Sequence, residues 1–247
     1  MKHQEENATA ETTAALEARL AAVKAKRGYL LPHHGLLALA FPRLLEGYDA
    51  AYSAMALDDR VLTHHDREFI WLAVLAATDE ALATHHIAKF RAAGGDDALI
   101  GAAFAAAALA IGAEAFDFAA YRWGAQLAPF DPRAAYLDAV AQIAPAAPRR
   151  LVHLAQCAVQ VCRARWRVLE WQIEAAYADH VPEDEIAEAM TLAMFPGSIP
   201  RFVEACGVWR GMIAAGRVAA SDRYKAWAAL TGQGGFDEVL AKTSTDK

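Results

Sequence analysis

A preference for helix runs through almost the whole chain and is the strongest constraint on its fold. Alanine, leucine, glutamate and arginine dominate nearly every long segment, and these residue types are good helix formers. The alternation of valine, isoleucine and threonine that is typical of strands is almost absent. Because 56% of the 247 residues are hydrophobic, the chain can bury a sizeable core. The sequence therefore predicts an all-α fold.

The charge pattern argues against nucleic-acid and membrane partners. The formal net charge is −6 and the lysines and arginines form no continuous stripe, so a polyphosphate backbone finds no basic surface. The polar and acidic residues 1–20 do not have the pattern of a signal peptide. The apolar segments 69–77 and 98–113 are shorter than the roughly 20 residues of a membrane helix. We expect a cytoplasmic protein.

The cysteines give no sign of a disulfide framework or a redox centre. Cys157, Cys162 and Cys206 cannot all pair, and the cytoplasm keeps thiols reduced. Cys157 and Cys162 are five residues apart, whereas a redox or zinc pair usually has about two intervening residues. We therefore expect no thiol chemistry.

A constant offset of 86 residues relates the two halves of the chain and indicates an internal duplication. It joins Ile100 to Ile186 (186 − 100 = 86) and Trp123 to Trp209 (209 − 123 = 86). A segment with four prolines, residues 127–150, separates the halves. The predicted parts are an N-terminal helix (residues 1–29), a first repeat (30–128), a second, degenerate repeat (129–218) and a C-terminal helix and tail (219–247).

The helices of the first repeat can be delimited from their caps. Residues 69–77 are apolar on every side, which predicts a central helix. We expect Thr78 to cap the next helix, with acidic residues in its first turn. Gly94 ends that helix, and Asp96 caps the one that follows.

Polar residues with possible chemistry gather in the first repeat. Histidines occur as adjacent pairs at residues 33–34, 64–65 and 85–86, and Glu68 stands at the head of the apolar helix. His65 is three residues from Glu68, so the two can share a helical face. The offset of 86 places Gln172 at the position of His86 and Leu154 at that of Glu68. We therefore assign any chemistry to the first repeat. The structural alternative is an ion pair between Glu68 and Arg67 or another arginine.

The segment DREFIWLAVLAATDEALATHHIAKFRAAGGDDALI resembles the carboxymuconolactone decarboxylase and alkylhydroperoxidase D-like superfamily. In that superfamily an arginine–glutamate pair opens an apolar helix, and a histidine follows about 19 residues later, then a glycine and an acidic cap. Arg67-Glu68, His86, Gly94 and residues 96–100 occupy these places. The similarity extends over most of residues 30–215 and implies two tandem alkylhydroperoxidase D-like helical repeats packed as one unit.

Two departures from the family pattern narrow the activity. The peroxidase branch needs two cysteines before the histidine, but Leu82 and Asp79 stand there, so no thiolate is present to attack peroxide. Glu68 and His86 are 18 rather than about 19 residues apart. Either one residue is missing from the connection, or His85 and His86 have exchanged roles.

The resemblance implies an enzyme of the carboxy-lyase type that needs no cofactor. Its substrate would be a small carboxylated lactone or oxo acid from aromatic-compound catabolism, and related isomerase or hydrolase chemistry is an alternative. His86, or His85 in its place, would supply the proton and Glu68 would orient the imidazole. The substrate-binding candidates are Lys89, Arg67, Arg91 and His65. Members of the superfamily assemble through apolar helices, so we expect a homo-oligomer, either a dimer or a trimer.

Three other interpretations remain open at this point. Glu68 with histidines of the pairs at 64–65 and 85–86 could bind iron or zinc, although the family uses no metal. The chain could be a non-catalytic helical binding or assembly protein. The tryptophans could form an aromatic wall for a planar substrate, although at helical positions they are more often core: Trp71, Trp123, Trp166, Trp171, Trp209 and Trp227.

Overall fold

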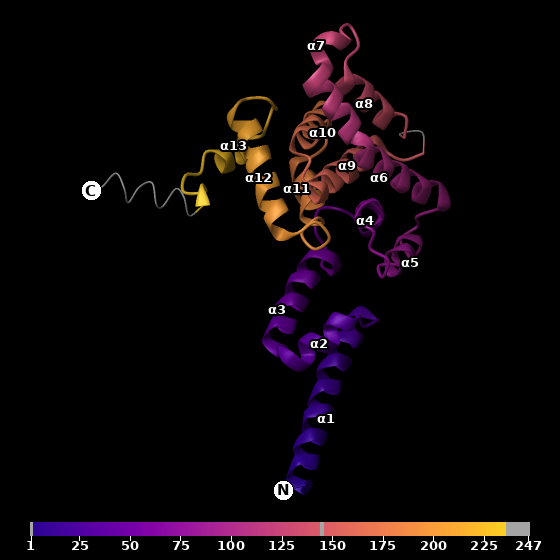
Figure 1. The fold of residues 1–247 in the computed structure, drawn as a ribbon, viewed down its shortest axis with the longest axis vertical. Helices are drawn as coiled ribbons and strands as arrows, with labels where there is room; N and C mark the ends of the chain where they lie inside the picture. The colour runs from indigo at the N-terminus through magenta and orange to yellow at the C-terminus, as the bar shows by residue number, and fades with distance from the viewer. Residues whose placement is uncertain (1, 144–145, 236–247) are drawn as a thin grey trace, which may run out of the picture. The chain divides into compact units, whose positions relative to one another are not determined.

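The computed structural model describes residues 2–143 and 146–235, and the regular elements in them are helices (Figure 1). This confirms the predicted all-α class. The chain divides into two compact units, residues 1–58 and 59–247. We call them the N-terminal and C-terminal units and describe each by itself.

The N-terminal unit is a long helix followed by two short ones. The two short helices are separated at Pro42, because the chain leaves helical geometry at Phe41 and Pro42 opens the next helix. Arg27 ties the long helix to the third one through Asp49, with 2.8 Å between Nη2 and Oδ1. The elements are α1 (Lys2–Arg27), α2 (Pro32–Ala40), α3 (Pro42–Tyr52) and a π-helical turn η1 (Ser53–Leu57).

The C-terminal unit is a bundle in which three helices form the centre. Helices α4, α6 and α9 pack against one another, and the remaining helices surround them. α4 and α9 are buried on nearly every side. The elements are α4 (His64–Ala77), α5 (His85–Ala92), α6 (Asp97–Phe118), η2 (Ala119–Trp123), α7 (Gly124–Leu127), α8 (Pro132–Ala141), α9 (Arg149–Arg163), α10 (Trp166–Ala178), α11 (Glu183–Thr191), α12 (Ile199–Ala214) and α13 (Asp222–Ala228) (Figure 1).

The predicted cap at Thr78 is wrong. Thr78 ends α4 instead of opening a helix, because its hydroxyl donates back to the carbonyl of Val74 at 2.9 Å. Asp79 then turns the chain with a φ of +57°, and α5 begins only at His85. The expected ends of the following elements are confirmed: the chain turns at Gly94 with a φ of +94°. The side chain of Asp96 then accepts a hydrogen bond from the first turn of α6.

The helix boundaries agree with the predicted offset of 86 residues at some places and differ from it at others. Adding 86 to the first residue of α4 gives 150, and α9 begins at residue 149; adding 86 to the first residue of α6 gives 183, where α11 begins. The same sum for α5 gives 171, but α10 begins at 166, and the single helix α6 corresponds to two separate helices. The tandem repeat therefore stays a prediction.

The apolar helix after Gly95 is longer than the sequence indicated. With η2 and α7 it runs continuously over residues 97–127, and by length and composition alone it could cross a membrane. A core helix of a soluble protein meets the same criteria. Its alanine face packs against α4, α8 and α9, and 33% of the apolar window is buried. Its outer face exposes Phe104, Ile111 and Phe118.

Candidate functional site

Glu68 and His86 meet in the interior of the C-terminal unit. Glu68 lies in the second turn of α4, and His86 lies in the first turn of α5. Nδ1 of His86 is 2.6 Å from Oε2 of Glu68. The two residues are only 4% and 1% exposed. A carboxylate in this position requires a partner because burial without one is costly, and the imidazole is that partner.

Two rings hold the imidazole of His86 in place. The indole of Trp71 lies with its centroid 5.0 Å from that of His86, and the His85 ring lies at 4.3 Å. Trp71 follows Glu68 by three residues, so both side chains share one face of α4. Nε1 of Trp71 is buried and has no hydrogen-bond partner among the described residues. An uncompensated donor costs free energy, so an acceptor at Nε1 would stabilise this region.

The hydrogen bond to Glu68 determines which ring nitrogen of His86 is available. A carboxylate accepts but does not donate, so Nδ1 carries a proton and donates it to Glu68. Nε2 of the neutral ring is then the acceptor, and it gains a second proton when the ring becomes an imidazolium. No residue in the described part of the chain hydrogen-bonds this Nε2. The geometry therefore provides an oriented proton donor or acceptor.

Arg67 does not lie beside His86. Its side chain is 1% exposed, and its Nε lies 3.2 Å from Oε1 of Glu188, on α11. The same carboxylate accepts hydrogen bonds from the backbone amides of Val61 and Leu62 at 2.7 and 2.8 Å. Arg67 and Glu188 thus fasten the segment before α4 to α11. The proposed structural pair between Arg67 and Glu68 is replaced by this contact.

The other substrate-binding candidates are spread around α4 and α5. Arg91 is exposed and pairs with Asp97 at 2.7 Å. His65 lies 3.1 Å from Asp66, and its ring contacts Phe90. Lys89 is half-buried on α5. The structure therefore brings together Glu68, His85 and His86, while Arg67, Arg91, His65 and Lys89 have interactions of their own.

The second half of the chain contains a polar cluster that the sequence analysis missed. Nδ1 of His153 lies 3.2 Å from Oε1 of Gln172, and its Nε2 lies 2.7 Å from Oδ2 of Asp179. Arg149 also pairs with Asp179, at 2.9 Å. We call these four residues the His153 cluster. Arg149, His153 and Asp179 line a cavity of about 280 Å³ together with Arg133 and other residues. The second half therefore has a polar cluster of its own, in which Gln172 stands at the position of His86 and the other members do not correspond to Glu68 or His86.

The cysteines and the histidine pairs were also candidates for reactive or metal-binding roles. Burial raises the pKa of Cys157 and of Cys162 to about 12. Both thiols are therefore protonated at neutral pH. Among residues 2–143 and 146–235, no three His, Cys, Asp or Glu side chains converge closely enough to hold a metal ion. The geometry favours Glu68 and His86 as the candidate site.

A cavity of about 440 Å³ lies beside α4 and α5 and is lined by Leu72, Thr84, Ile87 and seven neighbours. Leu72 stands one turn after Glu68, and Thr84 and Ile87 flank the two histidines in sequence. Glu68 and His86 are not among the residues that line this cavity.

Comparison with family models, curated proteins and solved structures finds no match for this chain. The geometry of the site therefore carries the functional argument.

Proposed function

We propose that this protein is a cofactor-independent enzyme of the decarboxylase type, in which Glu68 and His86 handle a proton. The 2.6 Å contact between the buried carboxylate and the imidazole supports this proposal. The substrate class rests on the resemblance of residues 66–100 to the carboxymuconolactone decarboxylase superfamily. It is a small carboxylated lactone or oxo acid, processed in the cytoplasm. Related isomerase or hydrolase chemistry would use the same pair.

The reaction needs one carbon–carbon bond to break and one carbon–hydrogen bond to form. The bond to the departing carbon dioxide breaks, and its electron pair moves into the conjugated carbonyl group to give an enolate. Protonated His86 then delivers the proton on Nε2 to that carbon, and the neutral ring later takes a proton from solvent. The enolate needs hydrogen-bond donors. Lys89 on α5 is the cation nearest to His86 in sequence, three residues away, and is the candidate for contact with a second carboxylate.

Glu68 has a defined role in this scheme. Its carboxylate accepts the Nδ1 proton, which fixes the ring orientation and leaves Nε2 for the substrate. Both residues are enclosed, and exclusion of water strengthens such interactions. Because both side chains are enclosed, substrate entry requires a local opening of the chain around the pair.

The experiment is a screen of carboxylated lactones and oxo acids for release of carbon dioxide, followed by matched variants. Glu68→Gln and His86→Gln should each lower turnover by about a hundredfold or more, the usual contribution of a positioned acid. His64→Gln is the control, because His64 lies at the start of α4 and is exposed. Full turnover in a folded His85→Gln/His86→Gln variant would rule the proposal out.

A second function, a non-catalytic helical binding or assembly protein, is favoured by the same burial. Because His86 is only 4% exposed and Glu68 only 1% exposed, the pair could serve only to join α4 to α5. In that case the Gln variants would lower the melting temperature and depress any activity only in proportion to the folded protein lost. Melting temperature and turnover on the same preparations separate the two functions.

We also propose a homo-oligomer, a dimer or trimer, formed through the outer face of α6. Phe104, Ile111 and Phe118 are spaced by seven residues and exposed, and a seven-residue apolar spacing is typical of helices that pair. Phe104→Glu should increase the monomer fraction in light scattering. A wild-type protein that is monomeric at micromolar concentration would count against this assembly.

A further inference from the structure

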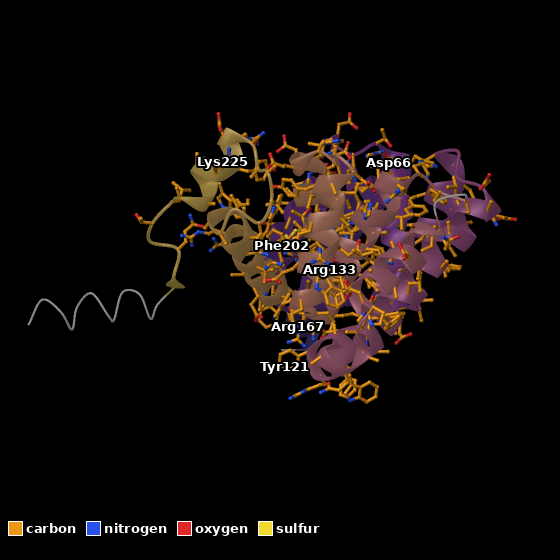
Figure 2. The ribbon with its side chains drawn as sticks, turned by 90° about the horizontal axis from the view of Figure 1, so that it is seen from above. Asp66, Tyr121, Arg133, Arg167, Phe202 and Lys225 are labelled. Carbon is orange, nitrogen blue, oxygen red and sulfur yellow. The ribbon has the colours of Figure 1, made fainter. Side chains whose placement is uncertain are left out.

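Another cavity, lined by aromatic side chains, lies between α11, α12 and α13. Its volume is about 420 Å³, within the roughly 300–1,000 Å³ of small-molecule sites. Figure 2 labels Phe202 on α12 and Lys225 on α13, the two helices that form its outer walls. The cavity is lined by four aromatic side chains together with polar residues: Phe202, Trp209, Tyr224 and Trp227, with Arg60, Asp184, Glu188, Thr191 and Arg223.

The aromatic rings of this cavity are fixed by one another and by their polar ends. The centroid of Trp209 is 5.1 Å from that of Tyr224 and 5.6 Å from that of Trp227. The indole nitrogen of Trp209 donates to the hydroxyl of Tyr177 at 3.2 Å, and the Tyr224 hydroxyl donates to Asp184 at 2.7 Å. Because the polar ends are engaged, the rings offer apolar surface to a ligand. A flat apolar group fits such a wall.

The two carboxylates at the cavity are committed to protein donors. Asp184 accepts from the hydroxyl of Tyr224 and from Arg223, at 2.7 and 2.8 Å. These contacts, that of Tyr224 first, hold the pKa of Asp184 below its usual value. Glu188 accepts two backbone amides through Oε2, and its Oε1 faces Arg67 at 3.2 Å. Neither carboxylate has strong attraction left for a cationic ligand.

Arg60 has unused donors at the same cavity. Its Nη1 donates to the hydroxyl of Thr191 at 3.1 Å, and its Nε lies 3.8 Å from Oε1 of Glu188, too far for a hydrogen bond. In the described part of the chain, Nη2 donates to no acceptor. The side chain is 27% exposed. A guanidinium with free coplanar donors is suited to a carboxylate.

We propose that this cavity binds a small aromatic carboxylate, with its ring against Trp209, Tyr224 and Trp227 and its carboxylate on Arg60. Because the cavity has more unused hydrogen-bond donors than unused acceptors, it favours an anionic ligand. Its aromatic walls favour a ligand with a planar ring. A quaternary ammonium ion also favours aromatic walls. Arg60 repels such a ligand, and the carboxylates of Asp184 and Glu188 are already paired with donors of the protein. The site is distinct from the Glu68–His86 pair and does not depend on its proposed function.

Isothermal titration with benzoate, benzamide and benzyltrimethylammonium tests the proposal on the full chain. Benzoate should bind saturably, benzamide at least tenfold more weakly because it lacks the charge, and the ammonium compound should not compete. Arg60→Gln should weaken benzoate binding at least tenfold. Trp227→Ala should also weaken it, and Trp227→Phe should restore most of it. Circular dichroism establishes that each variant is folded.

The control Arg167→Gln removes an exposed arginine of α10 that pairs with Asp117 on α6, and it should leave benzoate binding unchanged. Glu68→Gln should also bind benzoate normally, so failure of the proposed enzyme function would not affect this result. Equal affinity for benzoate and benzamide, unchanged binding in folded Arg60→Gln, or tighter binding of the ammonium compound would overturn the proposal. Absence of saturable benzoate binding below about 10 mM would do the same.

Discussion

The helix pairs α4–α5 and α9–α10 each bury an imidazole but use it differently. In the first pair, His86 is bonded through Nδ1 to Glu68, and its Nε2 has no partner among the described residues. In the second pair, both ring nitrogens of His153 are engaged, by Gln172 and by Asp179. An imidazole with one ring nitrogen free of hydrogen bonds can exchange a proton with a ligand. An imidazole with both ring nitrogens hydrogen-bonded holds helices together. Burial alone therefore does not distinguish a reactive histidine from a structural one.

The largest expected effect is on stability, and it compares the ion pairs that hold the start of α4 with those that hold the start of α9. The start of α4 is held by Arg67 and Glu188, whose side chains are both 1% exposed. The start of α9 is held by Arg150 between Asp66 and Glu185, with 35% of the Arg150 side chain exposed. Glu188→Gln should lower the free energy of unfolding by about 3–5 kcal/mol, because a buried guanidinium loses its counter-charge. Arg150→Gln should cost about 1 kcal/mol or less.

Urea denaturation of both variants measures this difference. A double variant, Arg67→Met/Glu188→Leu, provides the control, because it removes both charges and should recover much of the loss. If the two single variants lost equal stability, burial would not be the cause of the difference between the two anchors.

The next effect is on turnover and compares the two histidines directly. His86→Gln should reduce turnover by about a hundredfold, since a glutamine amide cannot deliver a proton. His153→Gln should leave turnover near that of the wild type, because its nitrogens are already occupied. Carbon dioxide release from a substrate found in the screen is the measurement. A larger loss in His153→Gln would transfer the candidate site to the second helix pair.

A smaller effect is expected on stability. His153→Ala should cost about 1–3 kcal/mol, because the buried side chain of Gln172 loses a partner and Asp179 is left with Arg149. His64→Ala should change stability by less than about 0.5 kcal/mol, because His64 is exposed. Thermal melting of the two variants beside the wild type gives the comparison. Similar melting temperatures for both would show that the His153 cluster contributes little to folding.

The features that the sequence could predict are local ones. The apolar run in α4 predicted a central helix, and Gly94 and Asp96 predicted the turn before α6 because a cap or a left-handed residue acts within a few positions. The resemblance directed attention to Glu68 and His86, which are in contact. The prediction that Thr78 caps a helix was wrong because its hydroxyl can hydrogen-bond either forward or backward along the chain, and it donates to the carbonyl of Val74.

Contacts between distant segments could not be predicted in this way. Glu188 is 126 residues from Leu62, and nothing in the acidic start of α11 indicates which charge it will face. His153 did carry a usable signal: it precedes Gln172 by 19 residues, close to the 18 between Glu68 and His86. The aromatic cavity combines Arg60 with residues of α11, α12 and α13, so only the folded chain reveals it.

The smallest expected effect is that of thiol reagents, and it concerns a chemical difference between the two pairs. α9 carries Cys157 and Cys162, while α4 has no cysteine. Burial raises the pKa of both thiols from 9.0 to about 12, so the folded protein holds almost no thiolate at pH 7.5. Since unfolded thiols ionise above about pH 9, the stability that these groups contribute is fully present below that pH and is lost as pH rises toward 12.

Iodoacetamide should leave both side chains unmodified and turnover unchanged. Mass spectrometry after alkylation, with urea-unfolded protein as the positive control, checks the modification. Rapid alkylation of Cys157 in the folded protein, accompanied by loss of turnover, would show that α9 opens or takes part in the reaction.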